Sequence, residues 1–234
     1  MDIVLLGAPG AGKGTQATLL RLWLPWPQVS TGVLFRTAMA DGSALGERVR
    51  GYVERGELVP DDVTLTVVRV RLAEPDCAAG AILDGFPRTL AQAQGLDVLL
   101  AAEGRTLGLV ADINVSEAML MSRLAGRWQC SECGAVYHAL LNPEVASGKC
   151  KACGGALYQR EDDAPAVQER RIEVYQAQTA PLKDYYRARG LLAEIDGEPA
   201  PVIVQRALRA AIMERMAGEA GAEAYRRDMD VGLA

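Results

Sequence analysis

The sequence predicts an α/β fold: a five-stranded parallel sheet with helices on both faces. Short apolar runs alternate along the chain with longer segments of helical spacing, which is typical of such sheets. The stretch GAPGAGKGTQ (7–16) follows the first apolar run and opens the first helix, the position of a phosphate-binding P-loop. The 234 residues suffice for one core of this kind with an appended module.

The five strands are predicted from apolar runs that are too short for helices. The first, DIVLL, leads directly into the glycine-rich stretch, and the third, AILD, ends in an acid. In chain order the predicted strands are 2–6, 27–30, 81–84, 107–115 and 191–196.

Amphipathic spacing predicts the helices between and after these strands. Ser30 or Thr31 can cap the helix that follows the second strand. The other predicted helices are 13–24, 44–56, 61–73, 90–104, 117–126, 165–189 and 201–216. Residues 126–163 break this rhythm with cysteines and glycines. The tail, 217–234, is small and polar, and we expect it to be flexible, either as a frayed helix or as a disordered segment.

Composition excludes several classes of function. The net charge of −5 argues against a general nucleic-acid surface. The chain has no apolar run long enough to span a membrane, and its first residues lack the features of a signal peptide. We therefore expect a cytoplasmic protein that binds neither nucleic acid nor membrane.

The glycine-rich stretch nearly matches the pattern G-x-x-x-x-G-K-[ST]. Gly7, Gly12 and Lys13 fit, but Gly14 occupies the hydroxyl position and Thr15 comes one residue late. The glycines allow backbone N–H groups to point inward, and Lys13 adds a positive charge for terminal phosphates. A glycine-rich turn without a ligand is the alternative, but the preceding strand, the following helix and the lysine favour a phosphate site.

Asp84 closes the third predicted strand, at the same edge of the sheet as the glycine loop. On its own it would be interpreted as a turn residue before Gly85. Together with the glycine loop it predicts a carboxylate that holds a Mg²⁺-bound water, since Mg²⁺ retains several of its waters. That arrangement would relieve Gly14 of the role of a ligand.

Four of the five cysteines follow the spacing C-x2-C-x16-C-x2-C, at Cys130, Cys133, Cys150 and Cys153. Paired C-x-x-C units indicate metal, and four thiolates predict a closed, structural Zn²⁺ site. A glycine after each second cysteine permits positive φ, so that N–H groups can turn toward sulfur. Iron in the same cage, or a redox pair, is the less favoured alternative.

These motifs together resemble the adenylate kinase family over about residues 1–215. GAPGAGKGTQ resembles the family's loop, in which glycine follows the lysine. The resemblance therefore implies that Gly14 is compatible with a working phosphate site. The other matching segments are STGVLFR (30–36), LDGFPRTLAQAQ (83–94), AGRW (125–128), VYH (136–138), REDD (160–163), RRIEVYQAQTAPLKDYY (170–186) and IDG (195–197). The cysteine-bearing insert is similar to the family's long, zinc-binding lid.

The resemblance implies the reaction ATP + AMP = 2 ADP with Mg²⁺, three functional regions and a monomer. The core would comprise 1–29, 60–125 and 164–216, with an AMP-binding helical insert at 30–59 and a zinc-bearing lid at 126–163. The implied catalytic residues are Lys13, Asp84, Arg88, Arg123, Arg127, Arg160 and Arg171. The implied ATP-binding residues are Gly10, Ala11, Gly12, Lys13, Gly14, Thr15, Arg127, Val136, Tyr137 and Pro199. The implied AMP-binding residues are Thr31, Arg36, Glu57, Leu58, Val59, Gly85, Phe86, Pro87, Arg88, Gln92, Arg160 and Arg171.

Three positions depart from the family pattern. Val33 stands where an acid usually follows STG, Trp128 replaces a usual second arginine, and Leu141 stands where an aromatic is common. Arg171 is ambiguous by count because Arg170 precedes it. Two other functions stay open: a UMP/CMP-type kinase and an ATP-gated zinc-ribbon binding module. The second phosphate site implied by Arg36 and Arg88 argues against the binding module, and Gln92 favours adenine.

Overall fold

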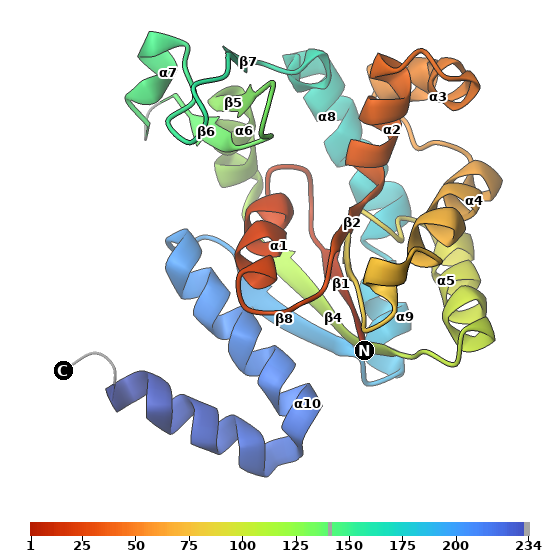
Figure 1. Ribbon diagram of the computed structural model, residues 1–234, viewed down its shortest axis with the longest axis vertical. Coiled ribbons are helices and arrows are strands. Elements are labelled where there is room, and N and C mark those ends of the chain that lie inside the picture. Colours follow the sequence, from red (N-terminus) through yellow and green to blue (C-terminus); the bar gives the residue numbers. More distant parts are fainter. Residues whose placement is uncertain (140–141, 232–234) are drawn as a thin grey trace.

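The computed structural model, which describes residues 1–139 and 142–231, is built around a five-stranded parallel sheet (Figure 1). The strand order is β2-β3-β1-β4-β8, so the prediction of a five-stranded parallel sheet is confirmed. The strands are β1 (Asp2–Leu6), β2 (Gln28–Ser30), β3 (Ile82–Asp84), β4 (Leu107–Asn114) and β8 (Leu192–Asp196). In the pairing of β1 with β3, Leu5 lies opposite Asp84. The end of β3 therefore lies beside the start of the glycine loop.

Alternate residues of the strands enter two separate cores, as expected for a sheet covered on both faces. Ile3 and Leu5 of β1 pack with α1 and α10, whereas Val4 and Leu6 pack with α4, α5 and α9. All four side chains are buried. Figure 1 shows these two groups of helices on opposite sides of the sheet. Residues 3–6 of β1 form a continuous apolar run because both faces of this strand are buried.

The helices agree with the prediction except near their ends and at two larger differences. They are α1 (Lys13–Arg21), α2 (Thr31–Ala40), α3 (Ala44–Glu54), α4 (Asp61–Leu72), α5 (Leu90–Ala102), α6 (Glu117–Ala125), α7 (Glu144–Ser147), α8 (Pro165–Val174), α9 (Leu182–Ala188) and α10 (Pro201–Val231). Short 3₁₀ turns cover Pro75–Cys77 and Glu161–Asp163.

The segment 165–189, predicted as one helix, is divided in two. A π-turn at Tyr175–Thr179 follows α8, and the N–H of Ala180 bonds to the carbonyl of Tyr175 at 2.8 Å. Pro181, which has no N–H to give, then separates this turn from α9. The last helix was predicted to end near 216 but continues to Val231. The flexibility of 217–234 stays a prediction, and 232–234 lie outside the described residues.

Two further units stand over the glycine-loop edge of the sheet (Figure 1). One contains α2 and α3, which pack on each other around a small apolar cluster with Phe35 and Val59. The other is a three-stranded antiparallel sheet of β5 (Arg127–Cys130), β6 (Val136–His138) and β7 (Leu157–Tyr158), in the order β6-β5-β7. Among the residues that the structure describes, its buried cluster consists of Cys130, Cys150 and Leu157, with partly buried side chains such as Trp128 packed against it.

Among the described residues, no helix combines the length and the apolar character needed to span a membrane.

Candidate active site

The glycine loop joins β1 to α1 and closes around the ammonium group of Lys13. Gly12, just before α1, has φ of 96°, which is the left-handed conformation that glycine adopts at little cost. Lys13 Nζ donates to the carbonyl oxygens of Gly7 at 2.7 Å and Ala8 at 2.9 Å. Burial lowers the pKa of Lys13 from 10.5 to about 8, although the nearby Asp84 opposes this change. A bound polyanion would restore the favourable environment that the ammonium lacks.

Asp84 lies beside this loop at the end of β3 and is 9% exposed. Its Oδ2 accepts a hydrogen bond from Gln28 Nε2 at 2.9 Å. A Cβ on Gly14 would lie 3.6 Å from the same oxygen, so Gly14 and Asp84 are direct neighbours. The sequence analysis did not identify Gln28. Gln28 could have been identified only from the pairing of β2 with β3, and the sequence alone does not give the strand order.

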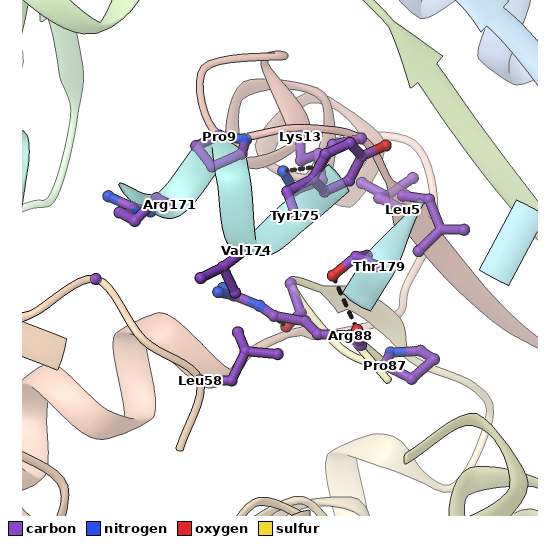
Figure 2. A pocket seen from close by; sticks show the side chains of 14 residues that line it. Leu5, Pro9, Lys13, Leu58, Pro87, Arg88, Arg171, Val174, Tyr175 and Thr179 are labelled. Atoms are coloured by element: carbon purple, nitrogen blue, oxygen red, sulfur yellow. Dashed lines mark hydrogen bonds between the residues drawn. The ribbon is translucent and has the colours of Figure 1, made fainter. Parts of the chain in front are cut away.

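Two pockets adjoin at this edge of the sheet. The first, of about 480 Å³, is lined on one side by the glycine loop, including Lys13, and on the other by Arg88 (Figure 2). The second, of about 570 Å³, extends between α2, α5 and the segment after α3. Leu58, Arg88 and Arg171 line both pockets. The two guanidinium groups therefore lie where a ligand in one pocket would meet a ligand in the other.

Most of the residues predicted to bind AMP line the second pocket. They are Thr31, Arg36, Glu57, Leu58, Val59, Gly85, Arg88, Gln92 and Arg171. Pro87 instead lines the first pocket. Phe86 is fully buried in the apolar core, so its side chain supports the loop from below.

Arg88 is held in place by its own loop. Its Nε donates to the carbonyl of Gly85 at 2.7 Å, and its carbonyl accepts from Thr179 Oγ1 at 2.8 Å (Figure 2). Gly85 has φ of 74°, and a Cβ there would lie 2.8 Å from Arg88 Nη2. Only glycine therefore combines this backbone conformation with the close approach of the guanidinium.

Burial, and then mutual repulsion, disfavour the charged form of the arginines around the pockets. Burial, followed by the charge of Arg171, lowers the pKa of Arg88 from 12.5 to about 10. Burial, followed by the charge of Arg36, lowers the pKa of Arg160 from 12.5 to about 10. A cluster of cations that disfavours its own charge is a site prepared for an anion.

The structure distinguishes Arg171 from Arg170. The Arg171 side chain is 16% exposed, lines both pockets and pairs with Asp162 Oδ2 at 2.9 Å. Arg170 is 53% exposed and pairs with Glu173 on the surface of α8. The residue before Ile172, which the family pattern favoured, is the one that faces the pockets.

Other predicted residues lie outside the two pockets. Arg127 makes a two-pronged contact with Asp163, and Arg160 Nε donates to Gln129 Oε1 in the lid. Arg123 donates to the carbonyls of Gly197 and Glu198 at 2.9 and 3.1 Å, just before Pro199.

Val136 and Tyr137 lie on β6, and the Tyr137 hydroxyl contacts Cys150 Sγ at 3.1 Å. The contacts of Val136, Tyr137 and Pro199 with ATP stay predictions.

Acidic residues that the sequence analysis did not assign organise the site. Asp162 and Asp163 hold Arg171 and Arg127, and Asp61 accepts from both Thr89 Oγ1 and Gln92 Nε2. In the segment REDD the sequence analysis assigns a role only to the arginine. Its carboxylates could have been expected to pair with arginines, but only the packing shows with which ones.

The four lid cysteines converge as the spacing predicted. Their Sγ atoms all lie within 4.8 Å of one another. Zinc–sulfur bonds of about 2.3 Å place tetrahedral sulfurs roughly 3.8 Å apart, so the spacing of these cysteines is compatible with Zn²⁺. Gly134 and Gly154, which follow the second cysteine of each pair, have φ of 71° and 78°. The positive φ predicted at both positions is confirmed.

A parallel sheet with a glycine loop at its edge and two adjoining pockets lined by cations is typical of P-loop proteins that bind phosphorylated ligands. Comparison with known proteins specifies this class further. The model of the family described as adenylate kinase matches residues 5–191.

Curated relatives give the same result. An adenylate kinase of Moorella thermoacetica is 51% identical over 205 residues, covering 87% of this chain and 94% of the relative. Adenylate kinases of Desulfitobacterium hafniense and Carboxydothermus hydrogenoformans are 50% and 49% identical, covering 85% and 84% of this chain and 91% and 92% of their own lengths. The chain belongs to the adenylate kinase family and is a nucleoside-monophosphate kinase. These comparisons give no support to the UMP/CMP-type or binding-module alternatives.

Proposed function

We propose that the first pocket holds the phosphates of ATP, that the second holds AMP, and that the phosphoryl group passes between them beside Arg88 and Arg171. The observation that carries this proposal is the shared lining of the two pockets. A protein that only bound ATP would need one anion site, whereas this chain forms two that meet at the same guanidinium groups. AMP is the acceptor because the family's substrates are adenine nucleotides and Gln92 lines the second pocket.

Catalysis in this site consists of positioning and charge stabilisation. Phosphoryl transfer proceeds through a loose transition state in which charge spreads over the equatorial oxygens. Lys13 and the N–H groups of the loop would hold the β and γ phosphates, while Arg36 and Arg88 would hold the phosphate of AMP. Arg171 would neutralise the transferred group, with Arg123, Arg127 and Arg160 reaching it from the lid side. No general base is needed between two phosphate oxygens.

Mg²⁺ would supply further charge neutralisation between the phosphates, and Asp84 would orient a water bound to it. The residues present fit this role, since a buried carboxylate lies beside the glycine loop and the Cβ position of Gly14. The absence of a side chain at residue 14 leaves room on that side of the carboxylate.

The predicted division into functional regions is retained in this proposal. Residues 126–163 would close over ATP and exclude water, so that transfer exceeds hydrolysis. Four thiolates fitted to Zn²⁺ would give this unit the order that its small apolar cluster cannot provide. A monomeric, cytoplasmic enzyme that binds no nucleic acid stays an expectation from the sequence.

The test is ADP formation from MgATP mixed in turn with AMP, UMP, CMP or GMP, with a reaction lacking acceptor as control. We expect rapid ADP formation with AMP and little with the other nucleotides. Preference for a pyrimidine would overturn the assignment of the second pocket while leaving the phosphotransferase in place. Binding of ATP without transfer to any acceptor would overturn the proposal as a whole.

A further inference from the structure

The two ends of the Gln92 side-chain amide are hydrogen-bonded to groups of which one can only donate and the other can only accept. Its Oε1 accepts from the backbone N–H of Arg88 at 2.8 Å, and its Nε2 donates to Asp61 Oδ1 at 2.7 Å. A backbone N–H can only donate, and an ionised carboxylate can only accept. Turning the amide over would set donor against donor and acceptor against acceptor. The two partners therefore select one of two orientations that have nearly the same shape.

Asp61 is well placed to impose this choice. It is the first residue of α4, and its Oδ1 also accepts from Thr89 Oγ1 at 3.0 Å. Thr89 in turn caps α5 by accepting from the N–H of Gln92 at 3.1 Å. The carboxylate thus connects the first turns of two helices, and Gln92 is only 2% exposed. The amide is fixed by packed secondary structure on both sides.

The amide retains one donor and one acceptor for a ligand. An amide has two hydrogens and two lone pairs, and the contacts above use one of each. Two hydroxyl groups also line the second pocket, but they donate to backbone carbonyls: Thr31 to Gly85 at 2.9 Å and Thr64 to Val59 at 3.2 Å. Gln92 is therefore the uncharged side chain of this pocket that can offer a donor and an acceptor side by side.

We propose that Asp61 is a specificity-determining positioning residue, which orients the Gln92 amide to accept a 6-aminopurine and refuse a 6-oxopurine. The inference rests on the proposed function, in which the second pocket takes the nucleoside monophosphate. A 6-aminopurine presents an amino donor beside a ring-nitrogen acceptor, and a 6-oxopurine presents a carbonyl acceptor beside a ring N–H donor. The two edges have the same outline and opposite hydrogen-bonding sense. A glutamine free to turn over would serve both, whereas a fixed glutamine serves one.

The experiment compares AMP with IMP as acceptors for MgATP in wild-type enzyme and in Asp61→Asn. The asparagine amide keeps the shape but can donate as well as accept, so of the two partners only the Arg88 N–H still favours one orientation of the Gln92 amide. We expect the ratio of kcat/KM for AMP to that for IMP to fall by about 10- to 100-fold, the factor for one hydrogen bond to a charged group. Asp61→Ala removes the acceptor entirely and should lower the ratio at least as much.

Asp62→Asn is the matched control. It makes the same chemical change one residue further along α4, where the side chain is 74% exposed and pairs with Arg48. Its ratio should equal that of the wild type. Equal losses of kcat/KM for AMP and IMP in both Asp61 variants would show that Asp61 only supports the structure, and would overturn the inference. An unchanged ratio in both would overturn it as well.

Gln92→Leu separates failure of this inference from failure of the proposed site. If Gln92→Leu loses the preference for AMP but the Asp61 variants keep it, the amide reads the base without help from Asp61. The inference then fails and the site stands. If Gln92→Leu keeps the preference for AMP, the base is recognised elsewhere, and both the inference and the assigned role of Gln92 fail.

Discussion

Replacing Arg88 by lysine separates the charge of this side chain from its geometry. In Arg88→Lys a cation remains at the junction of the two pockets, but the planar fork that can hold two oxygens at once is lost. Removing one preorganised donor from a site of developing charge lowers the rate by about 100- to 1000-fold. We expect a loss of that size in kcat/KM for AMP at pH 7.

The pH dependence of Arg88→Lys activity gives a second, independent test of the same reasoning. Burial lowers the pKa of Arg88 from 12.5 to about 10, so the guanidinium stays charged through neutral pH. A lysine starts from a lower value, and burial beside the same loop already lowers the pKa of Lys13 from 10.5 to about 8. Burial should likewise lower the pKa of a lysine at position 88 below that of a free lysine. The variant should therefore lose further activity between pH 7 and pH 9, where the wild-type guanidinium stays charged.

The assay is ADP formation from MgATP and AMP at intervals between pH 6.5 and 9.5, expressed as the ratio of variant to wild-type kcat/KM. Lys13 is present in both proteins, and because the charge of residue 88 is only a secondary influence on its pKa, most of its titration cancels in this ratio. Arg170→Lys is the control, because it makes the same change at an exposed surface position. A ratio within about threefold of unity at pH 7, or one that stays constant up to pH 9, would refute the reasoning about Arg88.

Three further predictions follow from the same geometry. In wild-type enzyme, kcat/KM for MgATP should fall above about pH 8, because Lys13 is charged below its lowered pKa of about 8 and loses that charge as the pH rises. The pKa of Lys13 is higher in the unfolded chain, at 10.5, so the contribution of Lys13 to stability rises with pH in the same interval. A kcat/KM that stays flat, or that falls only as the protein unfolds, would therefore contradict the role assigned to Lys13. Gly85→Ala should cost about 1–2 kcal/mol of stability for its positive φ and lower kcat/KM for AMP at least tenfold, because the new Cβ would lie 2.8 Å from Arg88 Nη2. Gly104→Ala, at φ of 66° with open space around its Cβ, should share the loss of stability in thermal unfolding but keep full activity. Cys133→Ser should lower the melting temperature more than it lowers the turnover of folded protein, because it would remove one ligand of the metal proposed to order residues 126–163. Identical melting curves of wild-type protein with and without a chelator would argue against that metal.

Much of the fold followed from local patterns in the sequence. Apolar runs located the five strands to within about a residue at each end, since a buried parallel strand needs continuous apolar side chains on both faces. The division of 165–189 was missed, because amphipathic spacing continues through the π-turn. Pro181 was the available signal for that break.

The functional site divides in the same way. The glycine loop, Asp84 at the end of a strand and the four cysteines were recognisable because their chemistry depends on short spacings within one segment. The partners that orient them were not. Gln28 and Asp84 are 56 residues apart in the sequence, and Asp61 and Gln92 are 31 apart, so no local sequence pattern indicates either contact.

The sequence by itself thus determined which elements form and which chemical groups they carry, because helix and strand periodicity, glycine conformation and metal-ligand spacing are local properties. The tertiary structure decided which of those groups meet. The strand order β2-β3-β1-β4-β8 places Gln28 beside Asp84. The packing of α8 turns Arg171 rather than Arg170 toward the pockets. The lowered pKa values of Lys13 and Arg88 arise from burial and neighbouring charges, which exist only once distant segments have packed together.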